Sequence, residues 1–175
     1  MKRSEINPMP EYYDRYINLV ADVELSQAFD ESLAQLNGLD MKALTRLENK
    51  PYAEGKWTVQ QILQHILDFE RIFNYRALLF ARNVGDPPQG IEEDDMAANS
   101  QADKRTVASI VEELKTVRAG TKFLYDSFDE QTLKIIGKSY SSEISIVALG
   151  FTSLGHQIHH LNVIKERYFP LLNEN

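Results

Sequence analysis

The sequence predicts an all-α protein that folds as a four-helix bundle, and three observations support this prediction. Four long stretches place apolar residues at three- and four-residue steps, the spacing of an amphipathic helix. Proline, glycine and short polar runs, which end helices, separate these stretches. No segment gives a convincing strand pattern. A length of 175 residues is typical of one domain, so a single bundle is expected over residues 1–175.

The first long helix is predicted from about Tyr12 to Leu36, after an extended lead-in that contains two prolines. Gly38 provides a stop signal, because glycine readily adopts the left-handed conformation found after helix ends. Asp40 is expected to cap a short helix over Met41–Leu47, since its carboxylate can accept the unpaired N–H groups of a first turn.

The second long helix is predicted from Val59 to about Arg82, with Thr58 as its N-cap. Its apolar stripe is formed by Ile62, His65, Phe69, Ile72, Phe73, Arg76 and Leu79. His65 is therefore expected on the buried face of this helix and not on its solvent face.

The segment 83–104 is too long for a simple connection in a compact domain. It contains prolines, glycines and the acidic run 92–95, which is expected to be a solvated loop. The segment is predicted to form either a functional cover or a loosely ordered excursion, and it could carry an end-to-end crossover of the bundle.

The third and fourth long helices are predicted over Thr106–Ser127 and Glu143–Tyr168, the latter ended by Pro170. Residues 129–143 between them are harder to place, and the polar end of this segment is turn-like. The inner positions of the fourth helix are expected to be Ile146, Leu149, Ser153, His156, His160, Val163 and Arg167. His156 and His160 thus occupy the middle of its buried seam.

Composition excludes several classes of function. The net charge is −7 with a pI near 5.1, and no Lys/Arg run marks a nucleic-acid partner. The chain has no cysteine, so it can form neither a disulfide nor a thiolate zinc site, and any thiol must arrive with the substrate.

The sequence also argues against a membrane partner. The N-terminus lacks the apolar core of a signal peptide, and no stretch approaches the ~18–20 apolar residues needed to span a bilayer. A cytoplasmic location is expected. Phe80 and Phe151 are expected at apolar outer positions, which leave room for a homodimer interface.

The histidines are the strongest functional signal. Three of the four histidines fall in residues 156–160, and His156 and His160 are four residues apart, so both rings lie on one helix face. A lone histidine on an apolar face is commonly a hydrogen-bonded core residue. Three imidazoles on inward seams would cost several kcal/mol unless each finds a partner, and one divalent cation would satisfy all three.

The sequence therefore predicts a metal site made by His65, His156 and His160. Imidazole ligands favour zinc or nickel, with iron or manganese as alternatives, and three protein ligands leave an open coordination position. His159 is rotated by about 60° from His156 on the helix, so it is expected at the flank of the site.

Three charged residues near the site are further candidates. Asp68, three residues after His65, could orient a ligand or accept a proton, although a solvated carboxylate is an alternative. Arg76 and Arg167 fall within apolar stripes, where they could bind an anionic substrate group or form structural ion pairs.

Two stretches resemble the signatures of the DinB/YfiT-like superfamily. The segment 55–71 (GKWTVQQILQHILDFER) and the following 75–78 (YRAL) resemble the signature of that family's second helix. The segment 155–161 (GHQIHHL) resembles its last-helix signature. The resemblance implies a bundle that is often dimeric, with a divalent metal held at the positions of His65, His156 and His160.

The resemblance also implies a class of reaction. Characterised relatives include transferases that join bacillithiol or mycothiol to electrophiles, and a mycothiol-dependent maleylpyruvate isomerase. The expected function is therefore a metal-dependent enzyme, a thiol-dependent S-transferase or a related hydrolase-like activity, whose partners are a small-molecule thiol and an electrophile. The segment Gly137–Glu143 departs from the glycine- and asparagine-rich run of close relatives, which leaves the substrate open. Two alternatives also stay open: a non-catalytic bundle that binds a small ligand, and a structural bundle in which a metal staples two helices.

Overall fold

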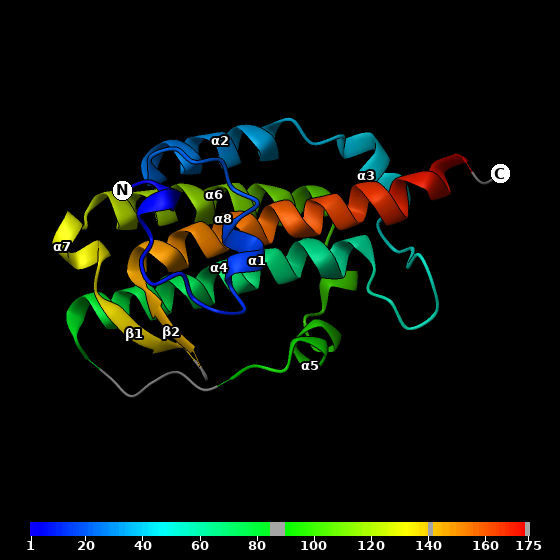
Figure 1. Ribbon diagram of the computed structural model, residues 1–175. Coiled ribbons are helices and arrows are strands. Elements are labelled where there is room, and N and C mark those ends of the chain that lie inside the picture. The colour runs from blue at the N-terminus through cyan, green and yellow to red at the C-terminus, as the bar shows by residue number, and fades with distance from the viewer. Residues whose placement is uncertain (85–89, 140–141, 174–175) are drawn as a thin grey trace.

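Four long helices form the body of the protein, which confirms the predicted bundle (Figure 1). The computed structural model describes residues 1–84, 90–139 and 142–173. Its elements are η1 (Arg3–Glu5), α1 (Asp14–Ile17), α2 (Leu25–Asn37), α3 (Met41–Leu47), α4 (Val59–Arg82), α5 (Glu93–Ala98), η2 (Ala102–Lys104), α6 (Val107–Asp126), α7 (Glu130–Leu133), β1 (Ile136–Ser139), β2 (Ser142–Ser145), α8 (Ile146–Val163), η3 (Ile164–Tyr168) and η4 (Phe169–Asn173). The bundle consists of α2, α4, α6 and α8.

The neighbouring helices α4 and α6 run in the same direction. Gln60, at the start of α4, donates a hydrogen bond to the carbonyl of Arg105 just before α6. Asn74, late in α4, donates one to Thr121, late in α6. The connection from residue 83 to residue 106 therefore returns the chain along the length of the bundle (Figure 1), and this confirms the predicted crossover. Residues 85–89 of this connection lie outside the described residues.

The predicted N-caps are present. The Asp40 carboxylate accepts a hydrogen bond from the Ala43 amide at 3.0 Å. The Thr58 hydroxyl accepts from the Gln61 amide at 3.2 Å, and the Gln61 side chain accepts from the Thr58 amide at 2.8 Å. This reciprocal capping box satisfies amide groups of the first turn and fixes the start of the helix that carries His65.

The prediction of one helix from Tyr12 to Leu36 is wrong. The structure has the short helix α1 and then α2, separated by residues 18–24. The break is held by the N-terminus: the Leu25 amide donates to the Met1 carbonyl, and the amino group of Met1 lies 2.7 Å from Glu24. These tertiary contacts replace helical hydrogen bonds, which the apolar spacing alone does not reveal. The break lets α1 turn across α8.

The segment between α6 and α8 also differs from the prediction. It contains α7 and an antiparallel hairpin in which Ile136 pairs with Ser145 and Ser139 with Ser142. The last helix begins at Ile146 and not at Glu143, because Glu143 lies in β2 and the Ser145 hydroxyl accepts a hydrogen bond from the Ala148 amide. The strands are short and polar, so they lack the alternation by which a strand is recognised.

Two apolar clusters fill the bundle, one toward each end of α8. One is built around Phe29, Phe73 and Phe151, and the other around Leu63, Ile110 and Ile164. Phe151 is fully buried, and Phe80 is partly buried and packs against the first cluster. The prediction that both side chains lie on the outer surface is therefore wrong.

A close backbone contact fixes how α1 packs against α8. A Cβ atom added at Gly155 would lie 1.9 Å from the carbonyl oxygen of Tyr16, so only glycine fits there. This contact places Tyr16 beside the helix face that carries His156. In the described part of the chain, no helix is long and apolar enough to cross a membrane.

Candidate metal centre

The structure brings together the three histidines that the sequence predicts as metal ligands. His65 comes from α4, and His156 and His160 come from successive turns of α8. The Nε2 atom of His156 lies 2.9 Å from that of His65 and 3.1 Å from that of His160. One nitrogen from each ring lies within 4.8 Å of the other two.

The donor set fits a divalent cation. Zinc binds imidazole nitrogen at ~2.0–2.1 Å, so tetrahedral ligands have nitrogens ~3.3 Å apart, close to the two distances that His156 makes with its partners. Three ring nitrogens that converge on one point would place lone pairs against each other unless a proton or a cation lies between them. Burial disfavours the proton, because it lowers the pKa of each imidazole. The cluster is therefore suited to a metal ion held by neutral imidazoles.

Aromatic side chains pack around the cluster and shield most of it from solvent. Phe69 packs against His65 with ring centroids 4.5 Å apart, and Trp57 packs against the same ring at 4.7 Å. Tyr16 meets His156 edge-on at 5.4 Å. His65 and His156 are only 3% and 4% exposed. These contacts fix the orientation of the rings, which would otherwise rotate freely about their side-chain bonds.

Burial lowers the pKa of all three imidazoles. Desolvation lowers the pKa of His65 to about 4 and that of His160 to about 3, and in His160 the neighbouring His65 acts in the same direction. For His156, burial and then the neighbouring His160 hold the pKa well below its usual value. Neutral imidazole is the form that binds a metal, so the fold maintains the ligands in the competent state.

The metal-free protein is expected to lose stability as the pH falls from 6.5 to 5. In this range the histidines of the unfolded chain bind protons and the buried ones do not, so unfolding takes up protons and becomes easier as pH falls. Each histidine contributes ~1.6 kcal/mol over the range, because the unfolded-state histidine is already half protonated at pH 6.5. Urea denaturation at both pH values, with EDTA present, measures the loss. His65→Leu should reduce the loss by about one third, and an unchanged pH dependence would contradict the assignment.

The Asp68 side chain makes its contacts outside the histidine cluster. Its carboxylate accepts a hydrogen bond from Gln64 at 2.9 Å and lies 3.9 Å from the guanidinium of Arg71. Burial raises the pKa of this carboxyl. Within the described residues, Asp68 makes no hydrogen bond to any of the three histidines, so the structure does not bring it to the cluster as the sequence suggested.

The fold places the remaining candidates, His159, Arg167 and Arg76, in three different surroundings. His159 is exposed at the flank of the cluster, where its ring meets Tyr16 at 5.5 Å. Arg167 is exposed, so the prediction of an inner position is wrong. The reason is that Arg167 lies in η3, a π-helical turn, where the α-helical spacing of α8 no longer holds. Arg76 is buried at 4% exposure and lines a cavity, described next.

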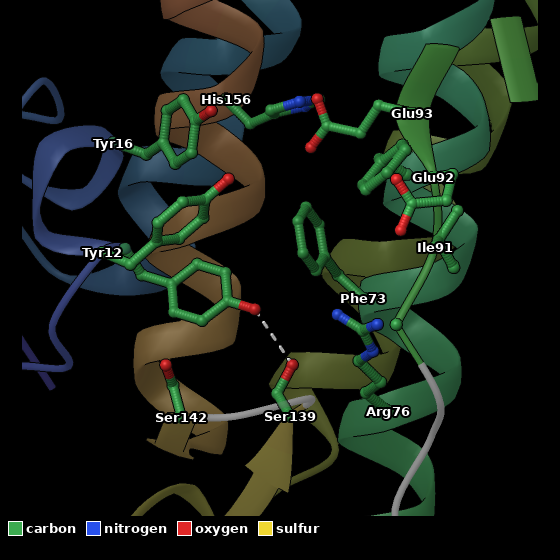
Figure 2. A pocket seen from close by; sticks show the side chains of 13 residues that line it. Tyr12, Tyr16, Phe73, Arg76, Ile91, Glu92, Glu93, Ser139, Ser142 and His156 are labelled. Atoms are coloured by element: carbon green, nitrogen blue, oxygen red, sulfur yellow. Dashed lines mark hydrogen bonds between the residues drawn. The ribbon is translucent and has the colours of Figure 1, made fainter. Parts of the chain in front are cut away.

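A cavity of about 250 Å³ opens beside His156. Its walls come from the N-terminal segment, α4, the residues around the start of α5, and the hairpin. Figure 2 shows His156 and Glu93 at one end of the cavity and Arg76, Ser139 and Ser142 at the other. The lining residues are Tyr12, Tyr13, Tyr16, Phe69, Phe73, Arg76, Gly90, Ile91, Glu92, Glu93, Ser139, Ser142 and His156. The cluster is therefore accessible to a small molecule from this side.

The acidic run 92–95, expected as a solvated loop, is exposed but forms the N-cap and the first half of α5. Glu93 faces His156 across the cavity (Figure 2), and Asp94 accepts a hydrogen bond from the Trp57 indole at 3.1 Å. Trp57 and Asp94 also line a second cavity of about 260 Å³ on the His160 side. Sequence reasoning missed Tyr16 and Glu93, because neither lies near a histidine in the chain; only the length of 83–104 signalled a functional cover.

Comparisons with known proteins identify the family and support the fold. A family model described as the DinB superfamily matches residues 24–164. A search of curated proteins found no match. Among solved structures, the chain is similar to one described as "YfiT from Bacillus subtilis is a probable metal-dependent hydrolase with an unusual four-helix bundle topology", with a TM-score of 0.68 and 17% identity over 92% of this chain and 88% of that one. At this identity the likeness shows the fold.

Proposed function

The chain belongs to the DinB superfamily, and on that basis we propose that it is an enzyme that depends on a divalent metal held by His65, His156 and His160. The convergence of three Nε2 atoms beside an accessible cavity is the observation that supports this proposal most directly. Imidazole ligands favour zinc or nickel, with iron or manganese as alternatives. The description of the YfiT structure as a probable metal-dependent hydrolase points in the same direction.

The metal would supply Lewis acidity at an open coordination position, by which it lowers the pKa of a bound water or thiol. The protein's own residues would do the rest. His156 presents the ligand cluster to the cavity, while the rings of Tyr16, Phe69 and Phe73 exclude water around it. Glu93 faces the same space and is placed to accept a proton from a reacting group (Figure 2).

The reaction that we propose is the transfer of a small-molecule thiol to an electrophile, with hydrolysis as the related alternative. The absence of cysteine means that the thiol is a second substrate and not part of the protein. We also propose that the protein acts as a homodimer. Incubating the metal-loaded protein with a thiol and 1-chloro-2,4-dinitrobenzene, and separately with 4-nitrophenyl acetate, separates the two reactions by their products.

Protein purified without chelator and without metal-affinity resin is expected to contain about one equivalent of a transition metal, or to take it up when Zn²⁺ or Ni²⁺ is added, because the three imidazoles are neutral and converge. Elemental analysis after desalting measures this. Less than about a tenth of an equivalent after both additions would end the proposal. Full metal loading with neither reaction detectable would favour a metal that only joins α4 to α8.

A further inference from the structure

The far end of the cavity contains a buried charge that has no carboxylate partner among the described residues. Arg76 is 4% exposed, and its Nε atom is buried and makes no hydrogen bond. Within residues 1–84, 90–139 and 142–173, its guanidinium pairs with no carboxylate. Arginine stays charged at any pH that a protein tolerates. A buried charge of this kind is costly unless something neutralises it.

The surroundings of Arg76 are built for hydrogen bonding. Figure 2 shows its guanidinium directed into the cavity, and Ser139 and Ser142 lie at the same end. Ser139 is fully buried, and its hydroxyl lies 3.1 Å from the hydroxyl of Tyr13. The position depends on the hairpin, since Ser139 and Ser142 are partners in its register. Three hydroxyl groups and one fixed cation thus share one end of the cavity.

The two ends of the cavity differ in chemistry. Arg76 follows His65 by about three turns of α4, or ~16 Å along the helix axis. Phe69 and Phe73 lie between them on the same face and provide an apolar wall. Tyr12 and Tyr16 lie opposite (Figure 2). A ligand that reached both ends would be elongated, with an apolar body.

From these observations we propose that Arg76, with Ser139, Ser142 and Tyr13, binds the carboxylate of an elongated substrate whose other end reaches the metal-binding cluster. This rests on the proposed function in that it identifies the substrate class of the same site. A guanidinium matches a planar carboxylate through two parallel N–H bonds. A single positive charge matches a monoanion, and Glu92 and Glu93, which also line the cavity, disfavour a dianion such as a phosphate monoester.

The test uses metal-free protein, so that it does not depend on the metal. The probes are 3-phenylpropanoate, its neutral analogue 3-phenylpropanamide, and phenyl phosphate, titrated into ¹⁵N-labelled protein and followed by NMR. The acid is expected to bind at least ~10-fold more tightly than the amide, since a charge-assisted pair is worth about one such factor. Shifts should concentrate at residues 69–76 and 136–139.

Arg76→Gln should weaken binding of the acid by at least ~10-fold and leave binding of the amide unchanged. The matched control is Arg82→Gln, an exposed arginine of the same helix outside the cavity, which should bind as the unaltered protein does. Equal affinity for acid and amide in the unaltered protein would overturn the proposal even if Arg76→Gln fails to fold. Tighter binding of phenyl phosphate would overturn the assignment to a carboxylate.

The outcome is separable from that of the metal proposal. If the protein takes up no metal but binds the carboxylate through Arg76, the carboxylate site is supported and the proposed metal-dependent activity is contradicted. If the protein takes up the metal but binds acid and amide equally, the metal site is supported and the carboxylate site is contradicted.

Discussion

His160→Ala is expected to weaken Zn²⁺ binding by more than ~100-fold, because it removes one of three converging nitrogens and leaves two. Loss of a group that merely orients a ligand already costs 10–100-fold in metal affinity, so loss of a ligand itself should cost more. Competition with a chromophoric chelator at pH 7.5 measures the affinity. At this pH the ligands are neutral, because burial lowers the pKa of His65 to about 4 and that of His160 to about 3, so protons do not compete with the metal.

His159→Ala is the matched control for this experiment. The two histidines are adjacent on α8, but His159 is exposed and is not part of the cluster of three. Its removal should leave Zn²⁺ affinity within about twofold, because His159 supplies no ligand and only edge contacts with the Tyr16 and His160 rings are lost. Equal losses in both variants would mean that the metal binds the exposed face of α8 and not the cluster between α8 and α4.

Arg118→Met is expected to destabilise the protein by ~3–5 kcal/mol, because it leaves a buried carboxylate unpaired. The Arg118 Nε atom lies 2.9 Å from Glu70, and both side chains are fully buried. Glu70 also accepts a hydrogen bond from Thr121, and Arg118 donates one to Ser32. This network joins α4, α6 and α2 at the level of the bundle next to the histidines. Urea denaturation of the metal-free protein at pH 7.5 measures the change.

Two further variants test whether the unpaired charge causes this loss. Glu70→Leu combined with Arg118→Met removes both charges and should recover much of the stability that the single change loses. Arg71→Ala breaks the partly exposed contact between Arg71 and Glu113, and it should cost less than ~1 kcal/mol. A double variant that is as unstable as Arg118→Met, or less stable, would show that packing and not charge is responsible.

The local signals in the sequence predicted the elements that depend on local interactions. Apolar spacing and the caps Asp40 and Thr58 placed α3 and α4 correctly, since a helix and its first turn are determined by residues within a few positions. The break before α2 was missed, because it is held by Met1, more than twenty residues away. The hairpin was missed for a similar reason: its position depends on contacts with the N-terminal segment, such as that between Tyr13 and Ser139.

The residues of the site also divide into those that local sequence determines and those that only tertiary contacts bring together. The four-residue spacing of His156 and His160 determined that their rings share a face, and the apolar stripe determined that His65 is buried, because both follow from helix geometry alone. Only the tertiary structure decided which side chains meet these histidines from elsewhere in the chain. Tyr16 reaches His156 because Gly155 admits the backbone of α1, and Glu93 reaches the cavity because the crossover carries α5 along the bundle. Such contacts join segments that are distant in sequence, and no local pattern records them.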